Sequence, residues 1–249
     1  MSGHSKWHSI KHQKAVTDAR RGQLFTKLTR EIIVAVRNGG PNPDVNFSLR
    51  LAVQRARDAS MPSDNIERAI KRASGATEGA SLVEMVLEGY GPGGSAILVE
   101  ALSDNRNRTI QAVRNIFSRA GGNLGEAGCV AWQFQPKGIV TVQTGEGDTE
   151  ELALLAIDAG AEDVTVETGM VQVYTKPGEL EQVREALEQK NIPVDSAEVS
   201  MVPKAVLELD EKAALQTLRL LEKLDELDDI RHVSSNVDFS DEVMEKYQE

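Results

Sequence analysis

Cysteine is almost absent from this 249-residue chain, which contains a single one, Cys129. One cysteine excludes an intramolecular disulfide framework and a zinc site built from several cysteines, and it is typical of a protein from a reducing cytoplasm. The apolar neighbours of Cys129 predict a buried thiol on a strand and not a nucleophile. Aromatic residues make up only 4% of the chain. The core is therefore expected to consist mainly of Leu, Val, Ile and Ala.

Long apolar runs are missing as well. No segment approaches the roughly 18 apolar residues that a membrane-spanning helix requires, and the charged N-terminus is not followed by the apolar region of a secretory signal. Ser2 stands where an N-myristoylation signal needs glycine. We therefore expect a cytoplasmic protein that makes no contact with a membrane.

Known catalytic patterns are absent too. The chain has no Ser/His/Asp or Cys/His arrangement, no nucleotide-binding glycine fingerprint and no zincin motif. Its acidic groups at Glu150, at Glu151 and within 225–229 have no His or Lys at a useful spacing, and we interpret them as solvated carboxylates. We expect no catalytic residue, no bound metal and no cofactor. An enzyme that uses a cleft between domains is the alternative class.

Positive charge is scarce overall but concentrated at one end. The formal net charge is −11. Residues 1–75 carry 14 basic and 6 acidic side chains, a net charge of +8, whereas residues 76–249 carry 14 basic and 33 acidic ones, a net charge of −19. This asymmetry indicates that the N-terminal part meets a polyanion while the acidic remainder keeps the protein in solution.

The basic part is interpreted as an arm followed by three short amphipathic helices. The helices are expected near residues 17–38, 46–59 and 63–73. Their apolar stripes are formed by Leu24, Leu28, Ile32 and Ala35, by Leu49, Ala52, Val53 and Ala56, and by Ile66, Ala69, Ile70 and Ala73. The glycines and proline at 39–41 end the first helix, and Pro62 separates the other two. Asp64 and Glu67 resemble a capping box for the third helix.

The sign of the charge on these helices indicates nucleic acid as a partner. A solvated helix face ordinarily mixes acidic and basic residues, and for any single helix that explanation suffices. Here the same positive sign recurs on three helices and the arm. The candidate nucleic-acid-binding residues are Lys6, Trp7, His8, Lys11, Lys14, Arg20, Arg21, Lys27, Arg30, Arg37, Arg50, Arg57, Arg68, Lys71 and Arg72.

The arm has two features of its own. Trp7 lies among cations, so it is suited either to stacking on a base or to pinning the arm onto the helices. His4, His8 and His12 recur every four residues. Because no Cys or carboxylate accompanies them, we interpret these histidines as phosphate-contacting or solvated groups and not as metal ligands.

Beyond residue 75 the pattern changes to short strands and helices. β-prone runs at 82–88, 96–102 and 130–134 surround one helix. The glycine-rich segment 89–94 is predicted to be a hairpin turn and not a phosphate loop, because a strand and not a helix follows it. Residues 138–202 show the order βαββαβ of a ferredoxin-like unit.

A helix near 211–224 and a strand near 230–237 have no partners of their own, so we join them to the earlier strands. The expected fold is α+β, with a basic three-helix head at 1–75 and two ferredoxin-like α+β domains, one inserted into the other. The discontinuous domain comprises 76–137 and 203–249, and the inserted domain comprises 138–202. A fusion of three consecutive domains is the alternative.

Several segments resemble the YebC/PmpR family along essentially the whole chain. They are Gly3–His12, Met61–Ile70, Gly89–Gly94, Asp104–Thr109 and Gly121–Gly125. The resemblance implies a three-domain α+β protein with a helical head and a role as a DNA-binding transcriptional regulator. It also implies a link to translation, because a mitochondrial relative activates translation of cytochrome c oxidase subunit I and bacterial members are connected with ribosomes stalled on proline-rich chains.

We therefore expect a cytoplasmic, non-enzymatic regulator of transcription whose basic head binds DNA and whose acidic body presents a surface to a protein partner. A translation factor that binds ribosomal RNA on the ribosome is the alternative, because phosphate contacts position a protein on either nucleic acid.

Overall fold

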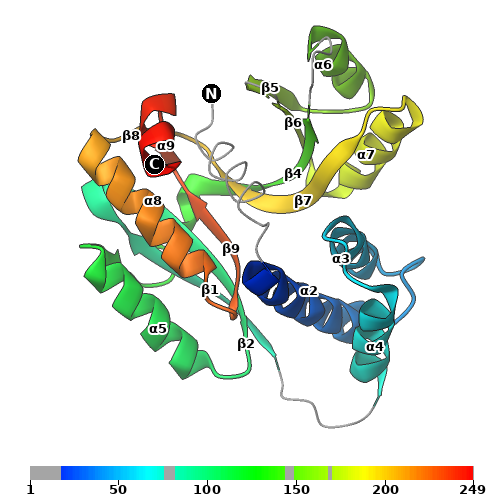
Figure 1. The fold of residues 1–249 in the computed structure, drawn as a ribbon, viewed down its shortest axis with the longest axis horizontal. Helices are drawn as coiled ribbons and strands as arrows, with labels where there is room; N and C mark the ends of the chain where they lie inside the picture. The colour runs from blue at the N-terminus through cyan, green and yellow to red at the C-terminus, as the bar shows by residue number, and fades with distance from the viewer. Residues whose placement is uncertain (1–17, 76–81, 144–148, 168–169, 249) are drawn as a thin grey trace.

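The computed structural model describes residues 18–75, 82–143, 149–167 and 170–248. Three N-terminal helices are followed by two four-stranded antiparallel sheets with helices packed on them (Figure 1). The α+β class, with a helical head before two sheet-containing domains, is confirmed. Within these ranges, no helix has the length and apolar character needed to cross a membrane.

The head is organised around one buried asparagine. Its helices are α2 (Asp18–Gly39), α3 (Phe47–Asp58) and α4 (Ser63–Ser74). α2 ends where Gly40 adopts a left-handed φ of 86°. Asn46 then caps α3 by accepting the Leu49 N–H at 3.1 Å, and its amide donates to the carbonyls of Ala35 at 2.7 Å and Gly40 at 2.8 Å. One side chain thus satisfies backbone groups of two helices and fixes the turn between them.

The predicted apolar stripes meet in one core, as expected. Its buried residues are Leu28, Ile32, Ala35, Val36, Leu49, Ala52, Val53, Ala56, Met61, Ile66 and Ala69. The predicted capping box is wrong, because Pro62 occupies the N-cap position of α4 and makes no side-chain cap hydrogen bond. Asp64 instead lies in the first turn, where the helix dipole favours a negative charge.

The first sheet joins strands from both sides of the inserted segment. In spatial order they are β3 (Asn123–Leu124), β1 (Val83–Tyr90), β2 (Ala96–Ser103) and β9 (Ile230–Ser235). On one face lie α5 (Arg106–Arg119) and α8 (Glu211–Asp225), whose Phe117 and Leu221 share a buried cluster with Val99 of β2 (Figure 1). The turn between β1 and β2 is the predicted hairpin turn, closed by the short helix η1 (Pro92–Gly94).

The second sheet has the connectivity of a ferredoxin-like unit. In spatial order its strands are β5 (Asp163–Glu167), β6 (Met170–Thr175), β4 (Phe134–Gln143) and β7 (Val194–Pro203). α6 (Thr149–Asp158) follows β4, and α7 (Leu180–Gln189) follows β6 after the short helix η3 (Pro177–Glu179). Leu152 of α6 and Leu187 of α7 are buried against the sheet. The predicted βαββαβ order is therefore confirmed.

The link from the first sheet to the second differs from the prediction. Val130 precedes a short helix, η2 (Ala131–Gln133), in place of the strand expected at 130–134. The reason is Glu88, whose carboxylate accepts the N–H groups of Gly128, Val130 and Ala131 at 2.7, 2.8 and 2.7 Å. Successive N–H groups of a strand point in opposite directions, so N–H groups that converge on one carboxylate require a curled backbone.

Cys129 lies in this curled segment and is only partly buried, so the prediction of a buried strand thiol is wrong. Burial and the neighbouring Glu88 charge both raise the pKa of the Cys129 thiol. The group is therefore protonated and poorly nucleophilic at neutral pH.

β4 and β7 are paired from Phe134 opposite Pro203 to Val142 opposite Val194, with a register shift near the far end. The domain boundaries expected at 137/138 and 202/203 fall inside these strands. Phe134 packs against Ala96 and Leu98, which alternate along β2 with the residues that face α5 and α8. The first sheet is thus covered by helices on one face and by the start of β4 on the other.

Three short elements near the C-terminus were not predicted from the sequence. β8 (Leu207–Glu208) and β10 (Val237–Asp238) form a two-residue parallel pair, and α9 (Asp241–Gln248) follows. Val243 and Met244 of α9 join the core of the first sheet. With four acidic or basic residues among eight, α9 is too polar to show an apolar stripe in sequence.

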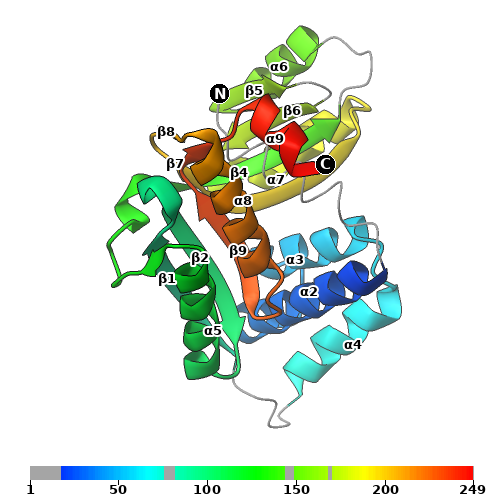
Figure 2. The same ribbon diagram turned by 60° about the vertical axis from the view of Figure 1, so that its left-hand side comes forward.

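The head packs against the body where α3 lies beside β7 (Figure 2). Arg55 of α3 contacts both sheets there. The Arg55 guanidinium lies 2.7 Å from Glu31 of α2 and 3.0 Å from Glu198 of β7, with His232 Nε2 of β9 3.4 Å away. Burial lowers the pKa of Arg55, but the charges of Glu31 and Glu198 outweigh this effect and raise it. Three parts of the fold therefore share one cation.

We expect Arg55→Leu to destabilise the protein by about 3 kcal/mol, because it leaves two buried carboxylates without their main counterion. Arg57→Leu is the matched control. Arg57 is exposed two residues further along α3, so its replacement should cost less than about 0.5 kcal/mol. Urea unfolding followed by circular dichroism measures both values, and equal stabilities of the two variants would contradict the structural role of Arg55.

The strand pairing also predicts which fragment folds alone. Residues 134–203 contain complete β4 and β7 strands, whereas 138–202 lacks the pairing of Phe134–Lys137 with Ser200–Pro203. We expect the longer fragment to unfold cooperatively at a higher temperature than the shorter one in a thermal melt. A longer fragment without cooperative unfolding would show that the second sheet depends on the rest of the chain.

Candidate nucleic-acid interface

Six of the nine candidate cations whose side chains the structure describes lie on the surface of the head. The exposed ones are Arg21, Arg37, Arg57, Arg68, Lys71 and Arg72. Arg50 is half-buried, with its guanidinium 5.8 Å from the centre of the Phe47 ring and hydrogen-bonded to the Pro43 carbonyl at 3.2 Å. Arg68 donates to Asn65 Oδ1 at 2.5 Å. Arg50 and Arg68 are therefore held by contacts within the head.

Two of the helices bring their cations together around a hollow of about 370 Å³. Arg37 of α2 and Arg72 of α4 line it with the hydroxyl-bearing Thr26 and Thr29. Arg30 and Asp104 also line it. Thr26 and Thr29 donate their hydroxyls to the carbonyls of Gly22 and Phe25 at 3.0 and 2.7 Å. The guanidinium groups are therefore the donors that this hollow offers to a phosphate.

Two predicted contact residues face inward. Lys27 donates to the Asp225 carbonyl and lies 3.4 Å from its carboxylate. Arg30 lies 2.7 Å from Asp229 Oδ1 and donates to the Asp228 carbonyl at 2.6 Å. The expectation of an outward basic face is wrong for Lys27 and Arg30, because α2 packs against the acidic loop that follows α8. The interpretation of 225–229 as solvated acid is therefore wrong for Asp225 and Asp229, whose side chains are only 21% and 12% exposed, whereas Glu226 and Asp228 are exposed.

Asp229 is the centre of this contact. It accepts hydrogen bonds from Thr109 Oγ1 at 2.7 Å, from Arg108 at 2.9 Å and from Ser103 Oγ at 3.2 Å, in addition to the Arg30 ion pair. Burial by itself raises the pKa of Asp229, but the hydrogen bonds from Thr109 and Arg108 and the charges of Arg30 and Arg108 outweigh it, so the pKa is lowered. The carboxylate thus stays ionised and joins α2 to the first sheet.

Some candidates lie outside the described residues. These are the arm residues Lys6, Trp7, His8, Lys11 and Lys14, and the side chain of Arg20. Their contact with nucleic acid stays a prediction.

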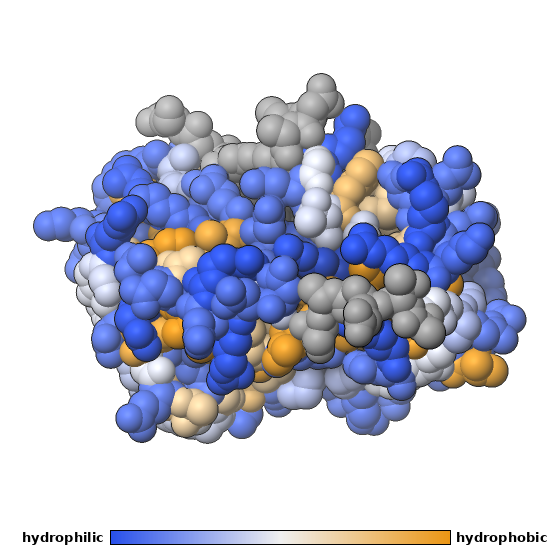
Figure 3. Space-filling view, turned by 90° about the horizontal axis from the view of Figure 1, so that it is seen from below, coloured by the Kyte–Doolittle hydropathy of each residue, from blue (hydrophilic) through white to orange (hydrophobic). Residues whose placement is uncertain are grey.

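Cations on α5 were missed by the sequence interpretation. Arg106, Arg108, Arg114 and Arg119 are all exposed, and the helix has no acidic residue. The absence of acidic residues from α5 can be seen in the sequence. It was not interpreted as a binding surface because α5 lies outside the basic head, and residues 104–109 served only as part of the family resemblance. Seen from below the view of Figure 1, the molecule is mainly hydrophilic and its apolar side chains form separate patches (Figure 3). Such a face suits polar contacts.

A metal site or a catalytic site has little support in the part of the chain that the structure describes. Within it, no group of three or more His, Cys, Asp and Glu side chains is arranged to hold a metal ion. Two hollows, of about 730 and 370 Å³, are lined mainly by basic, neutral polar and apolar side chains, each with a single carboxylate.

We expect Asp229→Asn to destabilise the protein by about 1–3 kcal/mol at pH 7, because it removes the charge that four donors share. The pKa of Asp229 is lowered on folding. Its stabilising effect is therefore complete above about pH 4, the ordinary Asp range, and is lost as the pH falls through the lower, folded-state value. The difference between wild type and variant should shrink on acidification.

Urea unfolding at pH 7 and at lower pH values measures this difference. Asp104→Asn is the control, because Asp104 pairs with the same Arg108 at 2.7 Å but is exposed, so little change is expected. A constant difference between wild type and Asp229→Asn across the pH range would contradict the assignment.

Comparison with known proteins agrees with the arrangement of head and body. Residues 5–76 match the model of the TACO1/YebC protein N-terminal domain, and residues 82–237 match that of the TACO1/YebC second and third domain. The resemblance to the YebC/PmpR family is thereby confirmed.

Individual relatives match over nearly their full length. A probable transcriptional regulatory protein of Dehalococcoides mccartyi is 58% identical over 99% of this chain and 98% of its own. One of Moorella thermoacetica, which carries the same description, is 51% identical over 99% of each chain. The crystal structure of a conserved hypothetical protein of Aquifex aeolicus has a TM-score of 0.87 and 47% identity, and the match covers 93% of this chain and 96% of that one. The chain therefore belongs to the TACO1/YebC family.

Proposed function

We propose that this protein is a DNA-binding transcriptional regulator that catalyses no reaction and that binds DNA through its helical head. The names of its relatives support a regulatory role in transcription. The observation that carries DNA binding is the set of exposed cations on α2, α3 and α4, in a chain whose net charge is −11. The proposal includes a cytoplasmic location.

We assign this role to the cations that are exposed on the head. Lys27 and Arg30 neutralise the acidic loop of the body, and Arg50 and Arg68 are partly engaged within the head. The exposed cations assigned to DNA binding are Arg21, Arg37, Arg57, Lys71 and Arg72. Five such contacts give a slope of roughly −4 to −5 for the logarithm of affinity against the logarithm of salt concentration.

The proposed contacts are mainly to phosphate. α4 presents Arg68, Lys71 and Arg72 on its exposed side, and guanidinium and ammonium groups bind phosphate oxygens without reading a sequence. The acidic excess of residues 76–249 repels DNA over most of the body. These acidic parts of the body remain available to a protein partner.

We expect Arg57→Ala with Arg72→Ala to weaken DNA binding and to make the salt slope shallower by about 2, because two phosphate contacts are lost. Lys190→Ala with Lys212→Ala is the control, since it removes the same charge from exposed positions on the body. Fluorescence anisotropy of a labelled duplex across a salt series measures both, with circular dichroism to confirm the fold.

Equal salt slopes for the two double variants would contradict the head as the binding surface. A parallel series with structured RNA tests the kind of nucleic acid. Tighter binding of RNA than of DNA at the same salt concentration would contradict the DNA assignment.

A further inference from the structure

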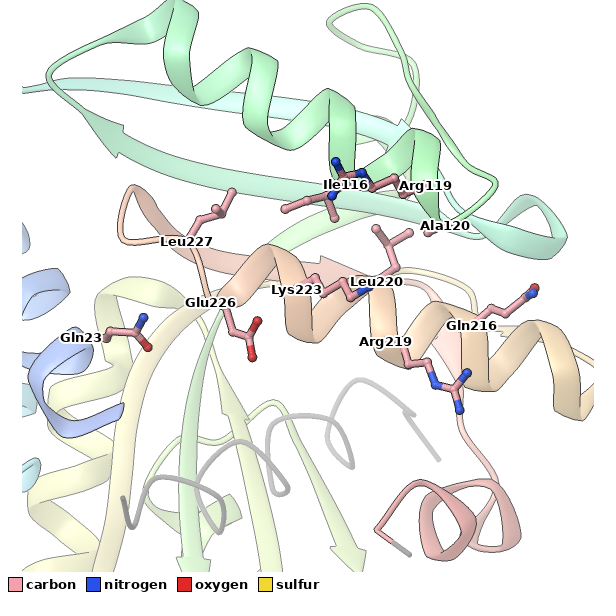
Figure 4. A pocket seen from close by; sticks show the side chains of 10 residues that line it. All are labelled: Gln23, Ile116, Arg119, Ala120, Gln216, Arg219, Leu220, Lys223, Glu226 and Leu227. Atoms are coloured by element: carbon pink, nitrogen blue, oxygen red, sulfur yellow. The ribbon is translucent and has the colours of Figure 1, made fainter. Parts of the chain in front are cut away.

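A second hollow, of about 730 Å³, runs between α5 and α8 on the body (Figure 4). Ile116, Arg119 and Ala120 come from α5, and Gln216, Arg219, Leu220 and Lys223 come from α8. Glu226 and Leu227 follow α8, and Gln23 of α2 completes the lining. Figure 4 shows Ile116 of α5 and Leu220 of α8 facing one another, whereas Arg219 and Glu226 point away from α5 and Gln23 lies at one end. We call it the α5–α8 groove.

The charge of this groove is opposite to that of the body around it. Three cations, Arg119, Arg219 and Lys223, line it against one carboxylate, Glu226. All three cations are exposed, and within the described residues none forms an ion pair or a side-chain hydrogen bond. Residues 76–249 have a net charge of −19. Unpaired cations gathered in such an acidic body form a local site for an anion.

The groove combines these cations with an apolar floor. Ile116, Leu220 and Leu227 lie between the charged side chains, and Gln216 and Gln23 add neutral hydrogen-bonding groups. An extended ligand with regularly spaced negative charges and less polar surface between them matches this lining. The phosphate and sugar groups of a nucleic-acid strand have that character.

The groove adjoins the helical head. Gln23 belongs to α2, two residues after the exposed Arg21, so the N-terminal end of α2 borders the groove. We infer that the α5–α8 groove binds the phosphate backbone of the DNA that the head binds, on the segment that extends past the head. This inference rests on the proposed function and adds a contact on the body.

The groove is tested with Arg119→Ala combined with Lys223→Ala. The matched control is Arg114→Ala with Lys212→Ala, which removes one exposed arginine from α5 and one exposed lysine from α8 without touching the groove. The probes are labelled duplexes of about 10 and about 30 base pairs, roughly one and three helical turns. Arg119→Gln with Lys223→Gln serves as a second groove variant that keeps longer, polar side chains.

For the long duplex, we expect both groove variants to bind about tenfold more weakly than wild type and to have a salt slope shallower by about 2. We expect little change for the short duplex, which the head alone can hold, and less than a twofold change for the control on either probe. Groove variants that match the control on the long duplex would overturn the inference. The same result from both groove variants excludes an effect of misfolding in one of them.

The head variant Arg57→Ala with Arg72→Ala separates the two proposals. If the head variant binds DNA weakly and the groove variants bind it as tightly as wild type, the proposed function stands and the groove is not a DNA-binding site. If the head variant binds both duplexes as tightly as wild type, the proposed binding of DNA by the head is contradicted. Inorganic phosphate is added as a competitor at constant ionic strength, and loss of the groove effect at millimolar phosphate would show a site for the free anion and not for DNA.

Discussion

The Arg55 guanidinium holds the orientation of the head relative to both sheets. It contacts Glu31, Glu198 and His232, which belong to α2, β7 and β9. A planar, permanently charged group with several donors can bind carboxylates from different directions at once, which the point charge of lysine does less well. Taking this cation from water costs free energy that its two carboxylates offset only in the observed arrangement. The contact therefore contributes more to specifying one arrangement of the head and the two sheets than to the free energy of unfolding.

The cations of this protein fall into two groups that the sequence does not distinguish. Arg55, Lys27 and Arg30 are paired with acids that lie far away in the chain, and they hold the head on the body. Arg57 and Arg72 lie on the surface. Neighbouring positions on one helix, such as Arg55 and Arg57, thus differ in role because they face opposite sides of it. A positively charged helix face predicts a negatively charged partner. Only the tertiary contacts show which residues of that face can bind the partner.

Local patterns predicted what local interactions determine. The apolar stripes of the head, the hairpin at 89–94 and the βαββαβ order all follow from periodicity and turn residues within short windows. The errors share a different cause. Lys27 and Arg30 are turned inward by an acidic loop some 200 residues later, and the strand expected at 130–134 is curled by the distant Glu88. α5 was not predicted to be a cationic surface, because only the tertiary structure brings its Arg119 into one groove with Arg219 and Lys223 of α8.

The continuous pairing of β4 with β7 has a mechanical consequence. A domain inserted through two single-chain linkers can rotate freely, whereas here both connections are strands hydrogen-bonded to each other across the boundary. Bending this ribbon would break ladder hydrogen bonds and separate Phe134 from Ala96 and Leu98. The second sheet is therefore attached to the first by a paired ribbon that resists bending. Because β7 of this ribbon also carries Glu198, a displacement of the second sheet would directly strain the Arg55 contact with the head.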